Sequence, residues 1–351
     1  MKIIDLFSGI GGFSLGFQRA GYQFTEHYFS EIDKHAIANY KHNFPHAKYI
    51  GDITTLHGRD FTDIDIITFG SPCQDFSLAG KREGLKGAKS SLIQHAIALI
   101  ADIRPSVFIW ENVKGAFSSN AGADFWAILQ AFANIGGYTI EWQLLNTSWV
   151  LPQNRERIYL IGHLAGRSEC GVFPIGENDS LSNRKAREEN WENTSFKTSH
   201  SRTITSRYYK TGSNDTYIQV GTYRTHNDGK GFREVKSNIA PTIPARARQD
   251  GSGMPVIRQL PRGKNKGADL TICPTISSNS FQENNLLGGV RRLTEIECER
   301  LQGFPDNWTQ YGNYNGIIKP IAKTQRYKLI GNAVTVDIVE LIAKRLKFTE
   351  Q

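Results

Sequence analysis

The 351-residue sequence has few cysteines and no long apolar run. A membrane-spanning helix needs about 20 predominantly apolar residues in succession, and no stretch of this chain approaches that length. The N-terminal sequence MKIIDLFSGIGGF carries an acid at position 5 and glycines soon after it, so it has no signal-peptide core. We therefore expect an intracellular protein of the cytoplasm.

The small number of cysteines also argues against two kinds of stabilising site. Cys73, Cys170, Cys273 and Cys298 lie far apart and form no CxxC pair. This spacing disfavours a structural zinc site and a disulfide framework. No bound metal is expected.

Positive charge is concentrated in the middle of the chain. The formal net charge is +8 and the pI is about 9.2. Residues 165–290 contain 18 lysines and arginines against 12 aspartates and glutamates, a net charge of +6. A basic region of this kind fits a polyanionic partner. A generic solubility surface is the alternative, and charge alone does not exclude it.

The first half of the sequence alternates short apolar runs with segments of helical periodicity. Expected strands lie at residues 2–7, 22–33, 63–69 and 106–113, and expected helices at 13–21, 34–43, 90–103 and 123–134. Strands that alternate with helices at this spacing are typical of an α/β fold with a parallel sheet covered on both faces. The stretch from residue 138 to 164 then resembles longer strands in hairpin succession.

The composition changes after residue 164, which suggests three parts. Residues 1–164 form the α/β domain, and residues 165–290, rich in Gly, Ser, Asn, Arg and Thr, a smaller domain of short strands and loops. Residues 291–351 regain helical periodicity and are expected to return to the first domain. Within the middle part, RTIT, PTIP and PTIS form a weak internal repeat.

A glycine-rich turn after the first expected strand suggests a nucleotide-like ligand. In DLFSGIGG the glycines allow close approach of the backbone to such a ligand, although a plain strand-to-helix connection is the alternative. Glu31 ends the second strand, where a carboxylate can accept hydrogen bonds from ribose hydroxyls. Asp52 and Ile53 end a third segment and are placed to hold an adenine edge. Together these features indicate an adenosine-containing cofactor.

Reactive side chains follow two further strands. Cys73, in GSPCQDFS, and Glu111, in ENV, each come at a strand end, where ligands bind in open α/β sheets. A half-buried inert thiol and a capping glutamate are the alternatives. Arg155 and Arg157, in QNRERIYLIG, alternate by two on an expected strand and so would face one side, able to bind a phosphate or a base carbonyl. A solvated strand face is the alternative there.

The motifs DLFSGIGGFSLGF, GSPCQDFS, ENV, QNRERIYLIG, RLTEIECERLQGFP and GNAV occur in this order. They closely resemble those of the cytosine-C5 DNA methyltransferases of bacterial or phage restriction–modification systems. The resemblance runs from Asp5 to about Leu346 and leaves out only the region from about 165 to 290. It implies a Rossmann-like, S-adenosylmethionine-dependent methyltransferase domain with a mostly parallel sheet, and a smaller target-recognition domain at residues 165–290.

The resemblance implies a catalytic role for four residues. The thiolate of Cys73 would add to C6 of cytosine, which makes C5 able to attack a methyl donor. Glu111 would hold N3 and the exocyclic amine and supply a proton. Arg157 would reach the base O2, and Arg155 would lie close to the nucleophile. The base that removes the C5 proton is not assigned.

The implied methyl donor is S-adenosylmethionine, which leaves as S-adenosylhomocysteine. Phe7 would stack on its adenine, and the turn glycines would make room for its methionine end. Glu31 would take the ribose hydroxyls, Asp52 the adenine amino group, and Asn332 with Ala333 would close the pocket. The full expected set is Phe7, Ser8, Gly9, Gly11, Gly12, Glu31, Ile32, Asp52, Ile53, Pro72, Leu92, Asn332 and Ala333.

The implied substrate is double-stranded DNA, from which the target cytosine must be flipped out because both its faces are needed. The basic middle domain would read the major groove. Expected DNA contacts come from residues on either side of the cleft: Gln74, Ser77, Arg155, Thr275 and Ile276. Thr203-Ile204 and Thr242-Ile243 suggest a duplicated reading module and more than one target sequence.

The remaining expectations concern partners and rival functions. The chain is expected to act as a nucleoid-associated monomer, with a cognate restriction endonuclease as a functional, not physical, partner. A tRNA cytosine-C5 methyltransferase is one rival, disfavoured by the length of the middle region. A catalytically inactive DNA-binding homologue is a second, and a nicotinamide-dependent dehydrogenase, which would need a GxGxxG turn, is a third.

Overall fold

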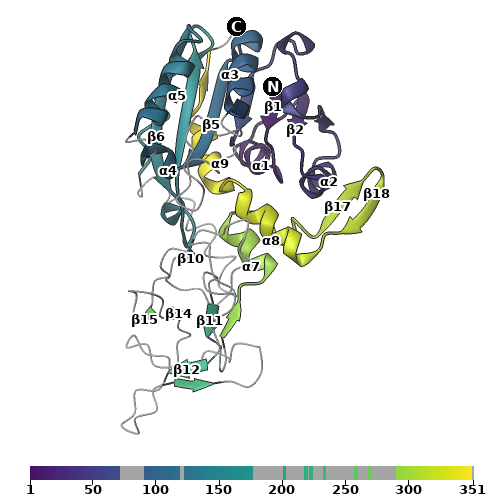
Figure 1. Cartoon of the computed structure of the whole chain (residues 1–351), viewed down its shortest axis with the longest axis vertical. Helices are drawn as coiled ribbons and strands as arrows, with labels where there is room; N and C mark the ends of the chain where they lie inside the picture. The colour runs from purple at the N-terminus through teal and green to yellow at the C-terminus, as the bar shows by residue number, and fades with distance from the viewer. Residues whose placement is uncertain are drawn as a thin grey trace.

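The computed structural model describes four long stretches of the chain, residues 1–71, 91–118, 122–176 and 290–349. Between residues 177 and 289 it also describes the backbone of short strands at 201–202, 217–219, 221–223, 232–234, 257–259 and 268–270. The long stretches form an α/β domain to which the C-terminal part of the chain returns (Figure 1).

A seven-stranded sheet organises this domain, with the strand order β3-β2-β1-β4-β5-β8-β6. Its strands are β1 (Lys2–Leu6), β2 (Glu26–Ser30), β3 (Lys48–Tyr49), β4 (Ile66–Phe69), β5 (Val107–Val113), β6 (Tyr138–Asn146) and β8 (Glu156–Leu164). The first five are parallel, whereas β8 runs antiparallel to both β5 and β6. The expected α/β class and mostly parallel sheet are therefore confirmed.

Helices bury both faces of the sheet. Ile4 of β1 belongs to a core that includes α3 (Ser91–Ile103) and α5 (Ala123–Ala133). Its neighbour Ile3 belongs to the opposite core, with α1 (Gly12–Arg19) and α9 (Val336–Arg345). Side chains alternate between the two faces of a strand, so two apolar neighbours serve two cores.

The C-terminal part forms a third core with α2 (Lys34–Asn43). Helices α7 (Glu295–Leu301) and α8 (Lys323–Asn332) contribute buried residues to this core. Between them in sequence, β17 (Tyr311–Tyr314) and β18 (Ile317–Pro320) form a hairpin that lies close to α2 and α8 in Figure 1. The hairpin was not expected from the sequence. Its turn contains Asn315 and Gly316, both with positive φ, and such a pair favours a tight hairpin.

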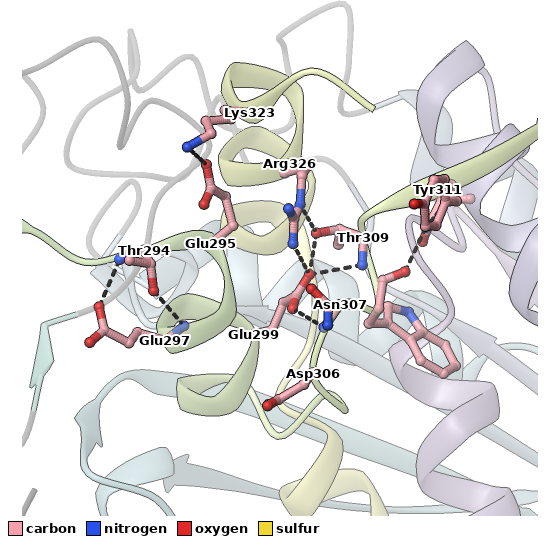
Figure 2. Close-up of polar contacts among 12 residues, drawn as sticks. Thr294, Glu295, Glu297, Glu299, Asp306, Asn307, Thr309, Tyr311, Lys323 and Arg326 are labelled. Carbon is pink, nitrogen blue, oxygen red and sulfur yellow. Dashed lines mark hydrogen bonds and ion pairs between the residues drawn. The ribbon is translucent and has the colours of Figure 1, made fainter. Parts of the chain in front are cut away.

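A buried carboxylate ties these C-terminal elements together (Figure 2). Glu299 is fully buried, and its Oε1 accepts hydrogen bonds from the backbone N–H of Thr309 at 2.8 Å and from Arg326 at 2.9 Å. Its Oε2 accepts one from the backbone N–H of Asn307 at 2.7 Å. A buried charge is tolerable only with partners of this kind, so Glu299 fixes α7 against the following loop and α8.

The first domain continues beyond residue 164. Residues 168–169 form β9, which pairs with β19 (Lys347–Phe348), and Val172 and Ile175 are buried in the core shared with α9. The described residues up to 176 therefore pack with the sheet. The architecture of the expected middle domain stays a prediction.

The other elements are short. They are η1 (Ile53–Thr55), η2 (Gly58–Asp60), α4 (Gly115–Ser118), η5 (Thr147–Trp149), β7 (Gln153–Asn154), β10 (Ser201–Arg202), β11 (Tyr217–Gln219), β12 (Gly221–Tyr223), β13 (Phe232–Glu234), β14 (Ile257–Gln259), β15 (Ala268–Leu270) and β16 (Val290–Arg292). Within the described residues, no helix is long and apolar enough to span a bilayer, and no three acidic, histidine or cysteine side chains form a metal-binding group.

Candidate functional site

The carboxyl ends of β1, β2, β4 and β5 lie along one edge of the sheet, because these strands are parallel. The expected site residues follow these strand ends. Gly70, after β4, lies so close to Glu111 of β5 that a Cβ at Gly70 would be 3.3 Å from Glu111 Oε2. The chain that leads towards residue 73 therefore leaves β4 directly beside the Glu111 carboxylate.

The turn after β1 has the backbone geometry that the glycines suggested. Phe7, Gly9 and Gly11 all have positive φ, at 50°, 54° and 83°. A Cβ at Gly11 would come within 2.3 Å of the Phe44 ring, whereas a Cβ at Gly9 would meet no described atom within 4 Å. Gly11 is thus required by packing, and Gly9 leaves open space where a ligand can approach the backbone.

Glu31 closes this turn from the neighbouring strand. Its Oε2 accepts a hydrogen bond from the Gly9 N–H at 2.9 Å, and its Oε1 accepts from the N–H groups of Ile32 and Asp33 at 2.7 and 3.0 Å. Next to it, the apolar side chain of Ile32 is 73% exposed. A fixed carboxylate beside an exposed apolar side chain suits a ribose and an adjoining base.

The other expected cofactor residues surround this edge less closely. Asp52 caps η1 by accepting a hydrogen bond from the Thr54 N–H at 2.9 Å, and Ile53 is buried beneath it. Leu92 is half-buried against the core of α3 and α5. Asn332, the last residue of α8, is exposed, while Ala333 is buried. A Cβ at Gly12 would contact Val334 at 2.7 Å, which keeps α1 against the C-terminal segment.

Glu111 and Arg157 form an ion pair. Arg157 Nε lies 3.1 Å from Glu111 Oε1, and both side chains are largely buried. Arg157 also donates from Nη1 to the backbone oxygen of Glu156 at 2.7 Å. The structure thus brings together two of the four expected catalytic side chains.

Arg155 does not lie on the strand that contains Arg157, so the expectation that the two share a strand is wrong. It lies between β7 and β8, and its guanidinium donates to the backbone oxygens of Gly331 at 3.3 Å and Ala333 at 2.7 Å. A short break after Asn154 removes Arg155 from the strand. Through these two hydrogen bonds, Arg155 connects the start of β8 to the end of α8.

Two residues that the sequence reasoning missed fix the end of β4. Ser71 Oγ accepts hydrogen bonds from Trp110 Nε1 at 2.9 Å and from Asn112 Nδ2 at 3.1 Å. Trp110 and Asn112 are buried on β5, on either side of Glu111 in sequence. The sequence feature that could have identified them is the ENV motif, since Asn112 is its middle residue and Trp110 directly precedes it. The chain at the end of β4 is therefore held by two side chains of β5.

Six expected site residues lie outside the described residues. They are Pro72, Cys73, Gln74, Ser77, Thr275 and Ile276. The two earlier Thr-Ile pairs of the weak repeat, at 203–204 and 242–243, also fall outside. Their roles stay predictions.

The fold is that of a Rossmann-like methyltransferase domain. The S. pombe Dnmt2 methyltransferase is similar in fold, with a TM-score of 0.54 at 19% identity over 97% of this chain and 96% of the other. A putative DNA modification methyltransferase of an E. coli prophage has a TM-score of 0.53 at 22% identity over 98% and 97%. The chain belongs to the C-5 cytosine-specific DNA methylase family, whose model matches residues 1–348.

Two similar curated proteins are named Type II methyltransferases. The Type II methyltransferase M.Bsp6I of Bacillus sp. (strain RFL6) is 29% identical over 99% of this chain and 98% of its own length. The Type II methyltransferase M1.ScrFI of Lactococcus lactis subsp. cremoris is 32% identical over 98% and 77%. The chain is accordingly a C-5 cytosine DNA methyltransferase, and its family implies DNA as substrate and S-adenosylmethionine as methyl donor.

Proposed function

We propose that the protein is a sequence-specific DNA (cytosine-5-)-methyltransferase that forms a covalent bond between Cys73 and C6 of a flipped-out cytosine. The placement of Glu111 carries this proposal. Its carboxylate is held by Arg157 at the end of β5 and lies beside Gly70, from which the chain runs to Cys73. A proton donor and a nucleophile-bearing segment thus adjoin one another at the strand-end edge.

The residues after β1 and β2 fit the adenosyl cofactor. Ser8 Oγ is buried and has no hydrogen-bond partner among the described residues, and Gly9 faces open space. The Glu31 carboxylate is available to ribose hydroxyls, Ile32 and Phe7 to the adenine, and Asp52 to its amino group. Asn332 and Ala333 would close the site from α8. When bound there, S-adenosylmethionine supplies the methyl group.

The proposed chemistry assigns one task to each side chain. The Cys73 thiolate adds to C6, while Glu111 stabilises the charge that develops on the ring at N3 by a proton or hydrogen bond. The electron pair released towards C5 makes that carbon nucleophilic. Arg157 keeps Glu111 in place and reaches the base O2. Once C5 is methylated, loss of its proton expels the Cys73 thiolate and restores the aromatic ring.

Target choice is assigned to the basic middle region, residues 165–290, whose net charge is +6. Residues 165–176 are excepted, because they pack with the first domain. Lysines and arginines attract the phosphate backbone, whereas individual side chains read base edges. Gln74 and Ser77 would contact the DNA from the catalytic side, and Thr275 and Ile276 from the recognition side. The Type II relatives suggest a cognate restriction endonuclease, against which this methylation would protect host DNA.

The Cys73→Ala variant tests the proposal. It should transfer no methyl group from labelled S-adenosylmethionine to duplex DNA, because it lacks the thiolate that is proposed to add to C6. It should still bind DNA and S-adenosylhomocysteine. Cys170→Ala, at an exposed cysteine remote in sequence from the site, is the matched control and should retain full activity. Turnover by Cys73→Ala, or methylation of tRNA in preference to DNA by the wild type, would contradict the proposal.

A further inference from the structure

Lys328 connects α8 to the strand-end site. Its Nζ lies 2.5 Å from Oδ2 of Asp33, a residue that follows β2 and immediately precedes α2. Lys328 lies on the same helix as Asn332, whereas Asp33 is two residues from Glu31. The ion pair therefore bridges two segments that each contribute a proposed cofactor residue.

Asp33 is held from both sides. Its Oδ1 accepts hydrogen bonds from the N–H groups of His35 at 2.8 Å and Ala36 at 3.3 Å, so it is the N-cap of α2. Burial disfavours the ionised carboxylate, but the hydrogen bonds from Lys328 and from the two backbone N–H groups outweigh burial and lower the pKa of Asp33. Asp33 is thus ionised at neutral pH and available to Lys328.

The position of Asp33 determines that of Glu31. The Asp33 N–H donates to Glu31 Oε1 at 3.0 Å, as does the Ile32 N–H at 2.7 Å, while Gly9 N–H holds the other oxygen. The direction of the carboxylate therefore depends on the backbone of residues 31–33. Asp33 anchors that backbone, and Lys328 anchors Asp33.

We propose that Lys328 is a positioning residue for the adenosyl cofactor, acting through Asp33 to hold the Glu31 carboxylate towards the ribose hydroxyls. This inference rests on the proposed function, in which Glu31 binds the ribose. Through Lys328, α8 supports the ribose side of the site and, through Asn332 and Ala333, closes it. A substitution at Lys328 should weaken cofactor binding without removing any group that touches the reacting atoms.

Lys328→Met is the direct test, with Lys323→Met as matched control. Lys323 lies on the same helix, but it pairs with Glu295 at 3.7 Å and its side chain is 82% exposed. The measurement is the Kd of S-adenosylhomocysteine by titration calorimetry without DNA. A partly exposed ion pair of this kind predicts a rise in Kd of about 2- to 5-fold for Lys328→Met, and no change for Lys323→Met.

Three further measurements separate positioning from general instability. At saturating cofactor, kcat of Lys328→Met should stay within about twofold of the wild type while the KM for S-adenosylmethionine rises. Lys328→Arg should restore the Kd. In an Asp33→Asn background, which keeps a capping side chain, Lys328→Met should cause no further loss, because its partner is already gone.

The inference is overturned if Lys328→Met binds S-adenosylhomocysteine as the wild type does, or if Lys323→Met weakens binding equally. A fall in kcat with an unchanged Kd also overturns it. Absence of binding to the wild type would instead overturn the proposed function, and this inference with it, so the two failures are distinguishable.

Discussion

At the scale of single residues, Glu111 is the described side chain on which the proposed chemistry depends most. It is 8% exposed and has Arg157 as its charged partner, and it lies beside the chain leading to Cys73. Glu111→Gln keeps the shape but cannot deliver a proton. The kcat for methyl transfer should fall by about 100-fold or more, while the Kd for S-adenosylhomocysteine stays unchanged.

Glu156→Gln is the matched control for this substitution. Glu156 lies on the same strand as Arg157 and pairs with Lys114, but its side chain is 39% exposed. Its loss should leave kcat near the wild-type value, because surface ion pairs contribute little. Near-normal turnover by Glu111→Gln would remove Glu111 from proton transfer, provided that its melting temperature matches the wild type.

At the scale of elements, a buried polar cluster joins β1, α1, β2, α2 and β4 beneath the glycine-rich turn. Asp5 accepts hydrogen bonds from Ser14 and Tyr40 at one oxygen and from Thr68 at the other. His27 Nε2 shares Ser14 and Tyr40 with it, at 2.9 and 2.8 Å. Burial raises the pKa of Asp5 to about 7 and lowers that of His27 to about 4.

These two shifts predict opposite effects of pH on stability. Between about pH 4 and 6.5, folding makes Asp5 take up a proton and His27 lose one, so their contributions cancel in the wild type. In Asp5→Asn only His27 remains, and the free energy of unfolding should rise with pH by up to about 1.4 kcal/mol per unit. In His27→Gln only Asp5 remains, and the free energy of unfolding should fall as pH rises towards 7.

Urea unfolding of the three proteins at several pH values between 4.5 and 7.5 checks this prediction. The informative quantity is the difference in unfolding free energy between each variant and the wild type, since it removes the contribution of all other groups. Parallel pH profiles for all three proteins would show that neither group changes its pKa on folding.

How far the sequence predicted the elements depended on where their contacts lie. Strands β1, β4 and β5 were predictable because their apolar side chains are buried on both faces of the sheet. The hairpin of β17 and β18 was missed although Asn315-Gly316 is a turn signal, because Ile317 and Ile318 are exposed and give no buried period. Arg155 was misplaced because its partners lie more than 170 residues away in the sequence.

In the candidate site, too, local features were predictable from the sequence and long-range contacts were not. Residues that follow single strands, such as Glu31 and Glu111, could be predicted from local pattern together with the family resemblance. The contacts that orient them could not, since Lys328 reaches Asp33 across 295 residues of chain. Sequence order shows which side chains follow strand ends, whereas only the fold shows which distant side chains hold them.

At the scale of the whole molecule, the proposed division of labour between chemistry and target reading can be separated by exchange. Val172 and Ile175 are buried against the core of α9, and β9 pairs with β19. An exchange that begins at residue 165 would therefore disturb the first domain. Exchange of residues 177–289 for the corresponding segment of the Lactococcus relative leaves these contacts intact.

The exchanged protein should methylate the sequence that the donor enzyme methylates and should melt near the wild-type temperature. Long-read methylation mapping of DNA from an expressing host measures the sequence, and exchange of residues 165–290 is the control expected to melt lower. An unchanged methylated sequence would place recognition outside residues 177–289.

The wild-type map also tests the duplicated reading module, because a single methylated motif would contradict it. Since the positive charge and the three Thr-Ile pairs all lie within the exchanged segment, one experiment tests both the location and the number of reading sites.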